Sequence, residues 1–212
     1  MIITVFGATG HVGRKIVWQG IARGATIRAF GRSIVDLIDE QERNEKLEAI
    51  KGYVFEPRDV YNAIQGADAV LSVLGGAFDG TDKTRSLGMK NIVTQMKKAG
   101  VQRIVALGGA GVLNSPDGGY LLNQPDYPEE YLPVGQEHLQ AFLYLKESGL
   151  DWTFVCAPDL KDGKETGNYV TEANYLPTPN NNYITTGDIA DFMLNELSHR
   201  KYVHQRVGIS GL

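Results

Sequence analysis

Three glycines near the start of the chain have the spacing of a phosphate-binding turn. The segment Gly7-Ala-Thr-Gly-His-Val-Gly13 follows an apolar run at residues 2–6 and precedes a helix-patterned run. Gly7 would permit a tight turn out of a strand, Gly10 would admit a pyrophosphate to the backbone, and Gly13 would let the helix pack closely. The helix N-terminus would add unpaired N–H donors and partial positive charge. We therefore predict a dinucleotide site that includes Gly7, Thr9, Gly10, His11, Val12 and Gly13.

The end of the second apolar run, at residues 25–30, indicates which dinucleotide binds. An NAD site usually places Asp or Glu there to hold the ribose diol. This chain has Arg32 and Ser33 instead, with no carboxylate before Asp36. A guanidinium pairs with a 2′-phosphate through charge-assisted hydrogen bonds, whereas an acid would repel it. Arg32 and Ser33 therefore favour NADP(H), with NAD(H) as the alternative cofactor; a solvated surface arginine is the other interpretation of Arg32.

Candidates for acid–base catalysis are few. No tyrosine after residue 107 has a lysine four positions later, and glycines occupy 108 and 109, where a Ser or Thr often polarises a substrate. The four histidines are scattered, so we expect surface or capping roles for them and no metal site. Asp159, after Pro158, is a candidate general acid if burial holds its proton; a turn cap is the alternative. Tyr127 and Tyr131 are candidate phenolic donors or aromatic walls, with loop packing as the alternative.

Strand-like and helix-like segments alternate along the chain. Strands are expected at 2–6, 25–30, 47–50, 67–74, 103–107, 151–156 and 206–209, with helices at 60–66, 84–99 and 137–148 and another opening at Thr185-Thr-Gly-Asp188. Such alternation predicts an α/β fold of the Rossmann type: a doubly wound parallel sheet with helices on both faces, in three layers. Ligands bind beyond the carboxyl ends of such strands, which adds a second set of cofactor-binding residues: Leu74, Gly75, Gly76, Gly108, Gly109 and Pro158.

Two irregular stretches interrupt this alternation. Residues 113–133 and 157–182 are rich in Pro, Gly and Asn, and both follow expected strands. Long loops in compact domains usually carry function, so we predict that these two form the walls of a substrate cleft; surface decoration is the alternative. No repeat or linker divides the 212 residues, which predicts a single domain over residues 1–212.

Composition excludes several classes of partner. The net charge is −4 and no basic run exceeds two residues, so we expect neither a nucleic acid nor an anionic membrane as partner. The single cysteine, Cys156, lies in an apolar run and is expected to be a buried thiol. With no secretory signal and no bilayer-spanning run, the sequence predicts a cytoplasmic protein, either a monomer or a homodimer.

Several motifs resemble those of a known family. Gly7-Ala-Thr-Gly-His-Val-Gly13, Gly66-Ala-Asp-Ala-Val-Leu-Ser-Val-Leu-Gly75 and Gly100-Val-Gln-Arg-Ile-Val105 look like the atypical short-chain dehydrogenase/reductase family. Later stretches resemble its branch of NAD(P)H oxidoreductases similar to flavin reductase and biliverdin reductase B: Gly108-Gly-Ala-Gly111, Pro125-Asp-Tyr-Pro-Glu-Glu-Tyr131, Leu150-Asp-Trp-Thr-Phe154, Gly163-Lys-Glu-Thr-Gly167 and Ile184-Thr-Thr-Gly-Asp-Ile-Ala190. The resemblance implies NADPH binding and hydride delivery to a small planar conjugated acceptor such as a flavin or quinone. Such chemistry needs little acid–base help.

The chain also departs from that branch. Tyr53 stands where the relatives have an aspartate that faces adenine. The resemblance therefore makes Tyr53 a candidate cofactor-binding residue whose ring stacks on adenine, with a simply exposed side chain as the alternative. Gly109 aligns with a serine of the flavin-reducing relatives, and Asp159 aligns with a histidine. These exchanges keep open a second hypothesis, a non-catalytic NADP(H)-binding redox sensor of the NmrA-like kind. A nucleotide-sugar epimerase or dehydratase is a distant third hypothesis. Those enzymes depend on a catalytic tyrosine with a lysine four positions later, and no tyrosine after residue 107 has one.

Overall fold

The computed structural model describes residues 1–34 and 44–212 of the chain. Its central feature is an eight-stranded sheet with the strand order β3-β2-β1-β4-β5-β6-β10-β8. The strands are β1 (Ile2–Phe6), β2 (Thr26–Gly31), β3 (Leu47–Lys51), β4 (Ala69–Ser72), β5 (Arg103–Gly109), β6 (Asp151–Ala157), β8 (Tyr169–Ala173) and β10 (Gln205–Gly211). All pairs are parallel except that of β8 with β10, which is antiparallel.

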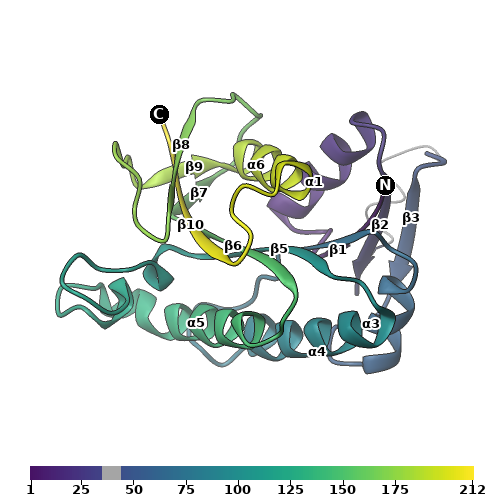
Figure 1. Ribbon diagram of the computed structural model, residues 1–212, viewed down its shortest axis with the longest axis horizontal. Helices are drawn as coiled ribbons and strands as arrows, with labels where there is room; N and C mark the ends of the chain where they lie inside the picture. The colour runs from purple at the N-terminus through teal and green to yellow at the C-terminus, as the bar shows by residue number, and fades with distance from the viewer. Residues whose placement is uncertain (35–43) are drawn as a thin grey trace.

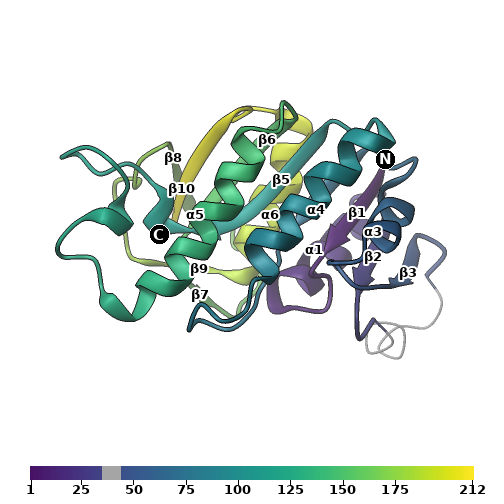
Figure 2. The same cartoon turned by 90° about the horizontal axis from the view of Figure 1, so that it is seen from below.

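Helices cover both faces of the sheet. The helices α1 (His11–Ala22) and α6 (Thr186–His199) lie on one face, and α3 (Pro57–Ile64), α4 (Thr84–Ala99) and α5 (Leu132–Lys146) lie on the other (Figure 1). Figure 2 shows α3, α4 and α5 side by side across the sheet. This arrangement confirms the predicted Rossmann-type α/β fold in three layers.

Each face of the sheet has its own hydrophobic core. On one side, Ile16 and Val17 of α1 pack with Ile189 and Met193 of α6 against the sheet. On the other side, the core includes Ile92, Met96, Phe142, Leu145 and Phe154, all almost completely buried. Because the sheet is covered twice, its central strands are apolar along their whole length, with few alternating polar positions. This pattern explains why β1 and β4 to β6 could be recognised from the sequence.

The two stretches expected to be irregular contain more structure than predicted. Residues 157–182 hold β8 and also β7 (Asp159–Lys161), which pairs with β9 (Tyr183–Thr185) in a separate two-stranded sheet. Residues 113–133 hold two single 3-10 turns, at Leu121–Asn123 and Glu129–Tyr131, and the first residues of α5. The helix begins at Leu132 instead of the expected position 137, because Pro133 occupies its first turn, where a missing N–H costs nothing.

Other local expectations can be compared with the structure. The capping motif before α6 is confirmed, because the Thr185 hydroxyl accepts a hydrogen bond from the Asp188 N–H at 3.0 Å. Asp36 lies outside the described residues. No helix within residues 1–34 and 44–212 combines the length and apolarity needed to cross a bilayer.

Cys156 is buried in β6, as expected, and burial raises the pKa of its thiol to about 12. Because the thiolate is the reactive form, we expect negligible labelling by a disulfide reagent such as DTNB at pH 8 in the native state. Unfolding in urea should make labelling at least ~100-fold faster, as the pKa returns to its ordinary value near ~8.5. Stopped-flow absorbance with N-acetylcysteine as reference checks this; rapid labelling of the native protein would contradict the burial of β6.

Candidate functional site

The glycine turn between β1 and α1 has a backbone that side chains would disrupt. Gly7 has a φ of +84°, and a Cβ built on it would lie 2.5 Å from the Val73 carbonyl oxygen. A Cβ on Gly13 would overlap the Gly7 carbonyl, well under the 3.0 Å that real Cβ contacts respect. The Gly10 N–H donates to the Gly7 carbonyl oxygen at 3.0 Å and closes the turn. Gly7 and Gly13 therefore allow β1, α1 and the end of β4 to approach one another closely.

The N-terminus of α1 can bind an anion. Gly10 is its N-cap residue and offers no side-chain cap, and the first turn has no acidic residue. The first helical bond runs from the Arg14 N–H to the Gly10 carbonyl, so the N–H groups of residues 11–13 have no partner within the helix. In α6, by contrast, Thr185 and Asp188 fill the equivalent position. Unpaired amides and the helix dipole at α1 fit a pyrophosphate group.

The end of β2 lies next to this turn. A Cβ on Gly31 would contact Thr9 at 3.5 Å, and the following residues, Arg32 and Ser33, are exposed. The Gly52 N–H donates to the Gly31 carbonyl, which brings the end of β3 alongside. The Tyr53 side chain beyond it is 58% exposed. Arg32 and Tyr53 therefore occupy neighbouring positions at the carboxyl edge of the sheet, as a role at the adenosine end of a dinucleotide requires.

The ends of β4, β5 and β6 continue the same edge. The register pairs Phe6 with Ser72, and Gly109 with Ala157. This places the predicted cofactor-binding residues of the three strand ends in one row: Leu74, Gly75, Gly76, Gly108, Gly109 and Pro158. A Cβ on Gly75 would meet no atom within 4 Å, whereas Gly108 is required by the Phe154 ring packed against it. Gly75 therefore borders open space at the edge where a ligand would lie.

A buried polar cluster holds the loop after β4 in place. The Arg85 guanidinium donates to the Gly76 and Ala77 carbonyl oxygens, both at 3.0 Å. Nearby, buried Glu137 of α5 accepts hydrogen bonds from Lys83 at 2.9 Å and from the Ser86 hydroxyl at 2.6 Å. The loop is thus fixed to the first turn of α4, which is itself bound to the second turn of α5 through Glu137, and this limits the positions that Gly75 and Gly76 can take.

A second polar contact joins the two stretches predicted to form the walls of a cleft. Arg206 of β10 donates from its guanidinium to the Val112 carbonyl oxygen and to the Asn114 side-chain oxygen. Its backbone N–H donates to the Asn174 side chain, and the Asn114 N–H donates to the Asn174 carbonyl oxygen at 2.9 Å. The segments around Asn114 and Asn174 are therefore bound to the same strand and to each other.

The three predicted catalytic side chains have different environments. Asp159 is exposed at the start of β7, so the burial that a general acid would need is absent. Tyr127 is half-buried; a Cβ on Gly111 would lie 2.6 Å from its hydroxyl oxygen, and one on Gly135 would lie 3.2 Å away. Burial, with a smaller contribution from Tyr131, raises the pKa of the Tyr127 phenol, which therefore stays protonated. Tyr131 is 41% exposed and could face a ligand.

Sequence reasoning missed one side chain at this edge. His138 of α5 was expected to have a surface or capping role, but its ring lies against Gly109, where a Cβ would be 3.0 Å from its Cδ2 atom. The signal was present in the sequence: His138 shares a helical stripe with Val134, Ala141 and Leu145, all of which are buried. Burial, assisted by the Arg85 charge, lowers the pKa of His138 to about 3, so the imidazole is neutral at physiological pH.

The comparison with known protein families agrees with the geometry of the glycine turn. A family model described as NAD(P)H-binding matches residues 7–200. The chain belongs to this NAD(P)H-binding family. A nicotinamide dinucleotide is accordingly its cofactor, and the family places the chain among oxidoreductase-like proteins.

The similarity of this NAD(P)H-binding chain to other proteins extends over almost its whole length. The uncharacterised protein YwnB of Bacillus subtilis is 27% identical over 97% of this chain and 96% of its own length. Among solved structures, a provisionally assigned epimerase from Bacteroides thetaiotaomicron is 30% identical, with a TM-score of 0.85, covering 100% of this chain and 97% of that one. A provisionally assigned NADH-flavin reductase from Streptococcus pneumoniae is 27% identical, with a TM-score of 0.84, covering 100% of both chains.

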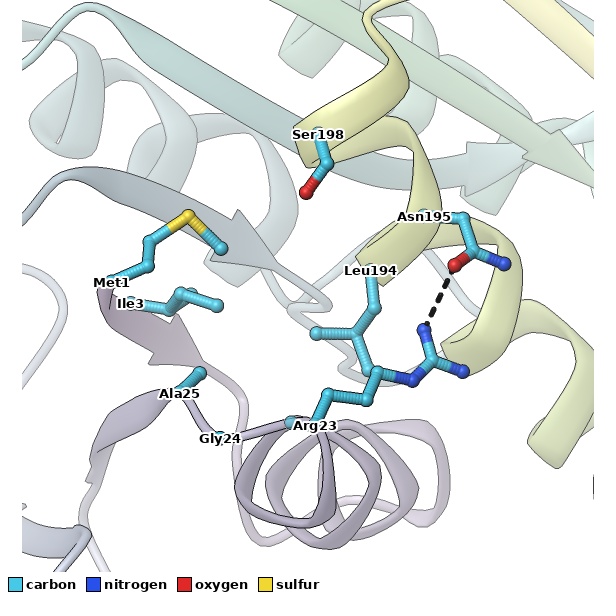
Figure 3. A pocket seen from close by; sticks show the side chains of 9 residues that line it. Met1, Ile3, Arg23, Gly24, Ala25, Leu194, Asn195 and Ser198 are labelled. Atoms are coloured by element: carbon cyan, nitrogen blue, oxygen red, sulfur yellow. Dashed lines mark hydrogen bonds between the residues drawn. The ribbon is translucent and has the colours of Figure 1, made fainter.

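A cavity elsewhere on the NAD(P)H-binding chain has a different character. It has a volume of about 190 Å³ and is lined by residues at the start of β1, the end of α1 and the C-terminal half of α6, including Met1, Arg23, Leu194 and Asn195 (Figure 3). Arg23 and Asn195 are hydrogen-bonded to each other at 3.2 Å. The cavity lies at the amino edge of the sheet, opposite the glycine turn, and is smaller than the ~300 Å³ of ordinary ligand pockets.

Metal ligands do not gather at either edge within the part of the chain that the structure describes. In residues 1–34 and 44–212, no three His, Cys, Asp or Glu side chains are close enough together to hold a metal ion.

Proposed function

We propose that the protein is an NADPH-dependent reductase that transfers hydride to a small planar conjugated acceptor, such as a flavin or a quinone. The observation that carries the proposal is the uncapped N-terminus of α1 beside Gly7 and Gly13, in line with Arg32 at the end of β2. When bound, the cofactor supplies the hydride, so the chain has to bind, orient and exclude water. Because the cofactor supplies the hydride, this chemistry is compatible with a chain in which no tyrosine after residue 107 has a lysine four positions later.

Each group of residues has a distinct part in this proposal. The amides of residues 11–13 hold the diphosphate, and Arg32 with Ser33 holds the 2′-phosphate. Tyr53 stacks on the adenine ring. Gly75, just beyond the end of β4, leaves room for the nicotinamide ring, because a Cβ there would meet no atom within 4 Å, and the buried Arg85 fixes the loop that carries Gly76. Tyr127 and Tyr131 form one side of the acceptor site, above the start of α5.

A second candidate function is an NADP(H) sensor that binds the dinucleotide without turnover. Two observations favour it: Gly109 carries no side chain that could polarise a substrate, and Asp159 is exposed. The two candidates separate in one assay, the decrease in NADPH absorbance in the presence of flavins, quinones and dicarbonyls. We expect steady oxidation with at least one planar acceptor. Tight NADPH binding with no turnover of any acceptor would instead support the sensor.

Arg32 provides the test of cofactor choice. Its removal in Arg32→Ala eliminates a charge-assisted contact worth ~1.5–3 kcal/mol, so the Kd for NADPH should rise about 10- to 100-fold. The Kd for NADH, which lacks the 2′-phosphate, should change by less than about threefold, because that charge has no partner there. Fluorescence titration of both nucleotides measures these changes.

Lys98→Ala is the matched control for the loss of one positive charge. Lys98 is exposed in the last turn of α4, far from the glycine turn. It should leave both dissociation constants unchanged. Equal affinity of the native protein for NADH and NADPH, with neither altered in Arg32→Ala, would reject the preference for NADP(H).

A further inference from the structure

The ring of His138 lies at the point of the site where an acceptor would approach. A Cβ on Gly109 would be 3.0 Å from Cδ2 and 3.5 Å from Nε2 of this ring. Gly109 is the last residue of β5 and pairs in register with Ala157, the last residue of β6, so the ends of β5 and β6 border the same part of the site. The absence of a side chain at position 109 is what allows the ring to occupy it. His138 thus fills, from α5, the position that a serine at 109 would otherwise reach from the strand.

The imidazole has no structural task that accounts for it. In the described ranges 1–34 and 44–212, neither ring nitrogen of His138 has a hydrogen-bond partner, although the side chain is half-buried. His204, by contrast, packs on Trp152 and its Nε2 is 3.1 Å from the Leu150 carbonyl oxygen. His11 and His199 are exposed. Because half-buried polar groups normally have partners, the two nitrogens of His138 are available to a ligand.

Charges around the ring keep it neutral. The neighbouring carboxylate, Glu137, already accepts hydrogen bonds from Lys83 and Ser86, so it does not hold a proton on the imidazole. Arg85 of α4 contributes positive charge, and both this charge and burial lower the pKa of His138 to about 3. A neutral imidazole has one N–H donor and one acceptor nitrogen, which suits a neutral carbonyl compound better than an anion.

We infer that His138 is a substrate-binding residue whose ring N–H donates a hydrogen bond to a carbonyl oxygen of the acceptor, and that the acceptor is a planar carbonyl compound of the quinone or isoalloxazine class. This inference rests on the proposed reductase function. The acceptor ring lies beside Gly109 at the end of β5, and its carbonyl oxygen points toward the His138 ring of α5, which borders that glycine.

The contribution of this hydrogen bond follows from the charge balance of the reaction. The acceptor receives a hydride, which carries two electrons and one proton, and negative charge grows on its carbonyl oxygen. A fixed N–H donor stabilises that charge. The second proton comes from water, because a neutral imidazole that lost its N–H proton would become a strongly basic anion. The ring therefore orients and polarises the acceptor, and is itself unchanged at the end of each turnover.

Kinetics with menadione as the quinone provide the first test. In His138→Leu, which removes the donor, we expect kcat to fall about 10- to 100-fold, the range for loss of a single donor to a developing oxyanion. The Kd for NADPH should remain within about twofold, since the ring does not contact the cofactor phosphates. His138→Gln, which keeps an N–H donor, should recover part of the lost kcat. His199→Gln, at the exposed end of α6, is the matched control and should behave as the native protein.

Imidazole NMR provides a second test that needs no turnover. The protein is labelled with ¹⁵N-histidine and loaded with NADP⁺. Addition of menadione or of FMN should then shift one pair of imidazole resonances, and this pair should be missing from the spectrum of His138→Gln. A native kcat in His138→Leu, together with no ligand-induced shift, overturns the inference while leaving the reductase proposal intact. Absence of turnover by the native protein with every acceptor instead refutes the reductase; the NMR shift then decides alone whether His138 binds a planar carbonyl ligand.

Discussion

Gly13→Ala is expected to weaken NADPH binding at least ~100-fold, a loss of about 2.7 kcal/mol. The added Cβ would overlap the Gly7 carbonyl, which is backbone and cannot rotate away. The start of α1 would have to move outward from β1, and the amides of residues 11–13 would no longer converge on the diphosphate. Such crowding also costs about 1–3 kcal/mol of stability, so binding has to be measured below the melting transition. Isothermal titration calorimetry with a parallel circular dichroism melt provides both values.

Gly31→Ala is a suitable control for this substitution. It adds the same methyl group one strand away, at the same edge of the sheet, where the Cβ would make only ordinary contacts with Thr9 at 3.5 Å and beyond. We expect its Kd to stay within about fivefold of the native value, or ~1 kcal/mol. If Gly13→Ala bound NADPH as well as Gly31→Ala does, the diphosphate could not lie on the glycine turn.

The second large effect concerns stability. Arg103 of β5 and Glu196 of α6 form a buried ion pair with 3.1 Å between nitrogen and oxygen, and the side chains are only 6% and 2% exposed. Glu196 also accepts hydrogen bonds from the Thr153 hydroxyl and from the Tyr202 backbone N–H. Glu196→Gln would leave the Arg103 charge buried without a counter-ion. The free energy of unfolding should fall by about 3 kcal/mol, because breaking a buried pair from one side costs ~3–5 kcal/mol.

Glu48→Gln tests the same chemical change in an exposed pair. Glu48 contacts Arg28 at 2.9 Å, but its side chain is 56% exposed. Solvent screening limits such a pair to less than about 1 kcal/mol. Urea denaturation of both variants with a common m-value gives the comparison. Similar losses in the two variants would show that the Arg103–Glu196 pair contributes no more than a surface contact.

The sequence was most informative where local pattern and tertiary environment agree. Helix α4 runs from Thr84 to Ala99, as expected, because its buried positions recur at helical spacing and Gly100 ends it with a φ of +72°. The central strands were recognisable because burial on both faces makes them continuously apolar. Because the carboxyl ends of parallel strands lie at one edge of a sheet, recognising these strands also predicted that the glycine turn and the ends of β4 and β5 share that edge.

Two short strands, β7 and β8, could not be predicted from the sequence. Strand β7 is Asp159-Leu-Lys161, which is exposed and carries a charged residue at each end, and its existence depends on pairing with β9, over twenty residues away. Strand β8 is half-buried and is ordered by antiparallel pairing with β10 at the end of the chain. Neither has a periodic pattern strong enough to distinguish it from a loop, because nonlocal backbone pairing decides its conformation.

His138 was missed for a related reason. A helix predicted to begin at 137 places His138 in the first turn, where a capping role is the ordinary interpretation. The actual start at Leu132 moves His138 to the second turn, on the buried stripe. An error of five residues at a helix boundary therefore changed the interpretation of a side chain at the site. Proline at a first-turn position was the local signal that could have corrected it.

The shared anchoring of the segments around Asn114 and Asn174 has a consequence for how this protein could diverge. Since Arg206 and the two asparagines join the regions around positions 114 and 174, an altered shape in one region would be transmitted to the other. Proteins of this lineage that adopt a new acceptor should therefore exchange residues in both regions together. Libraries built to change substrate preference should vary the two as a single unit, with Arg206 kept constant.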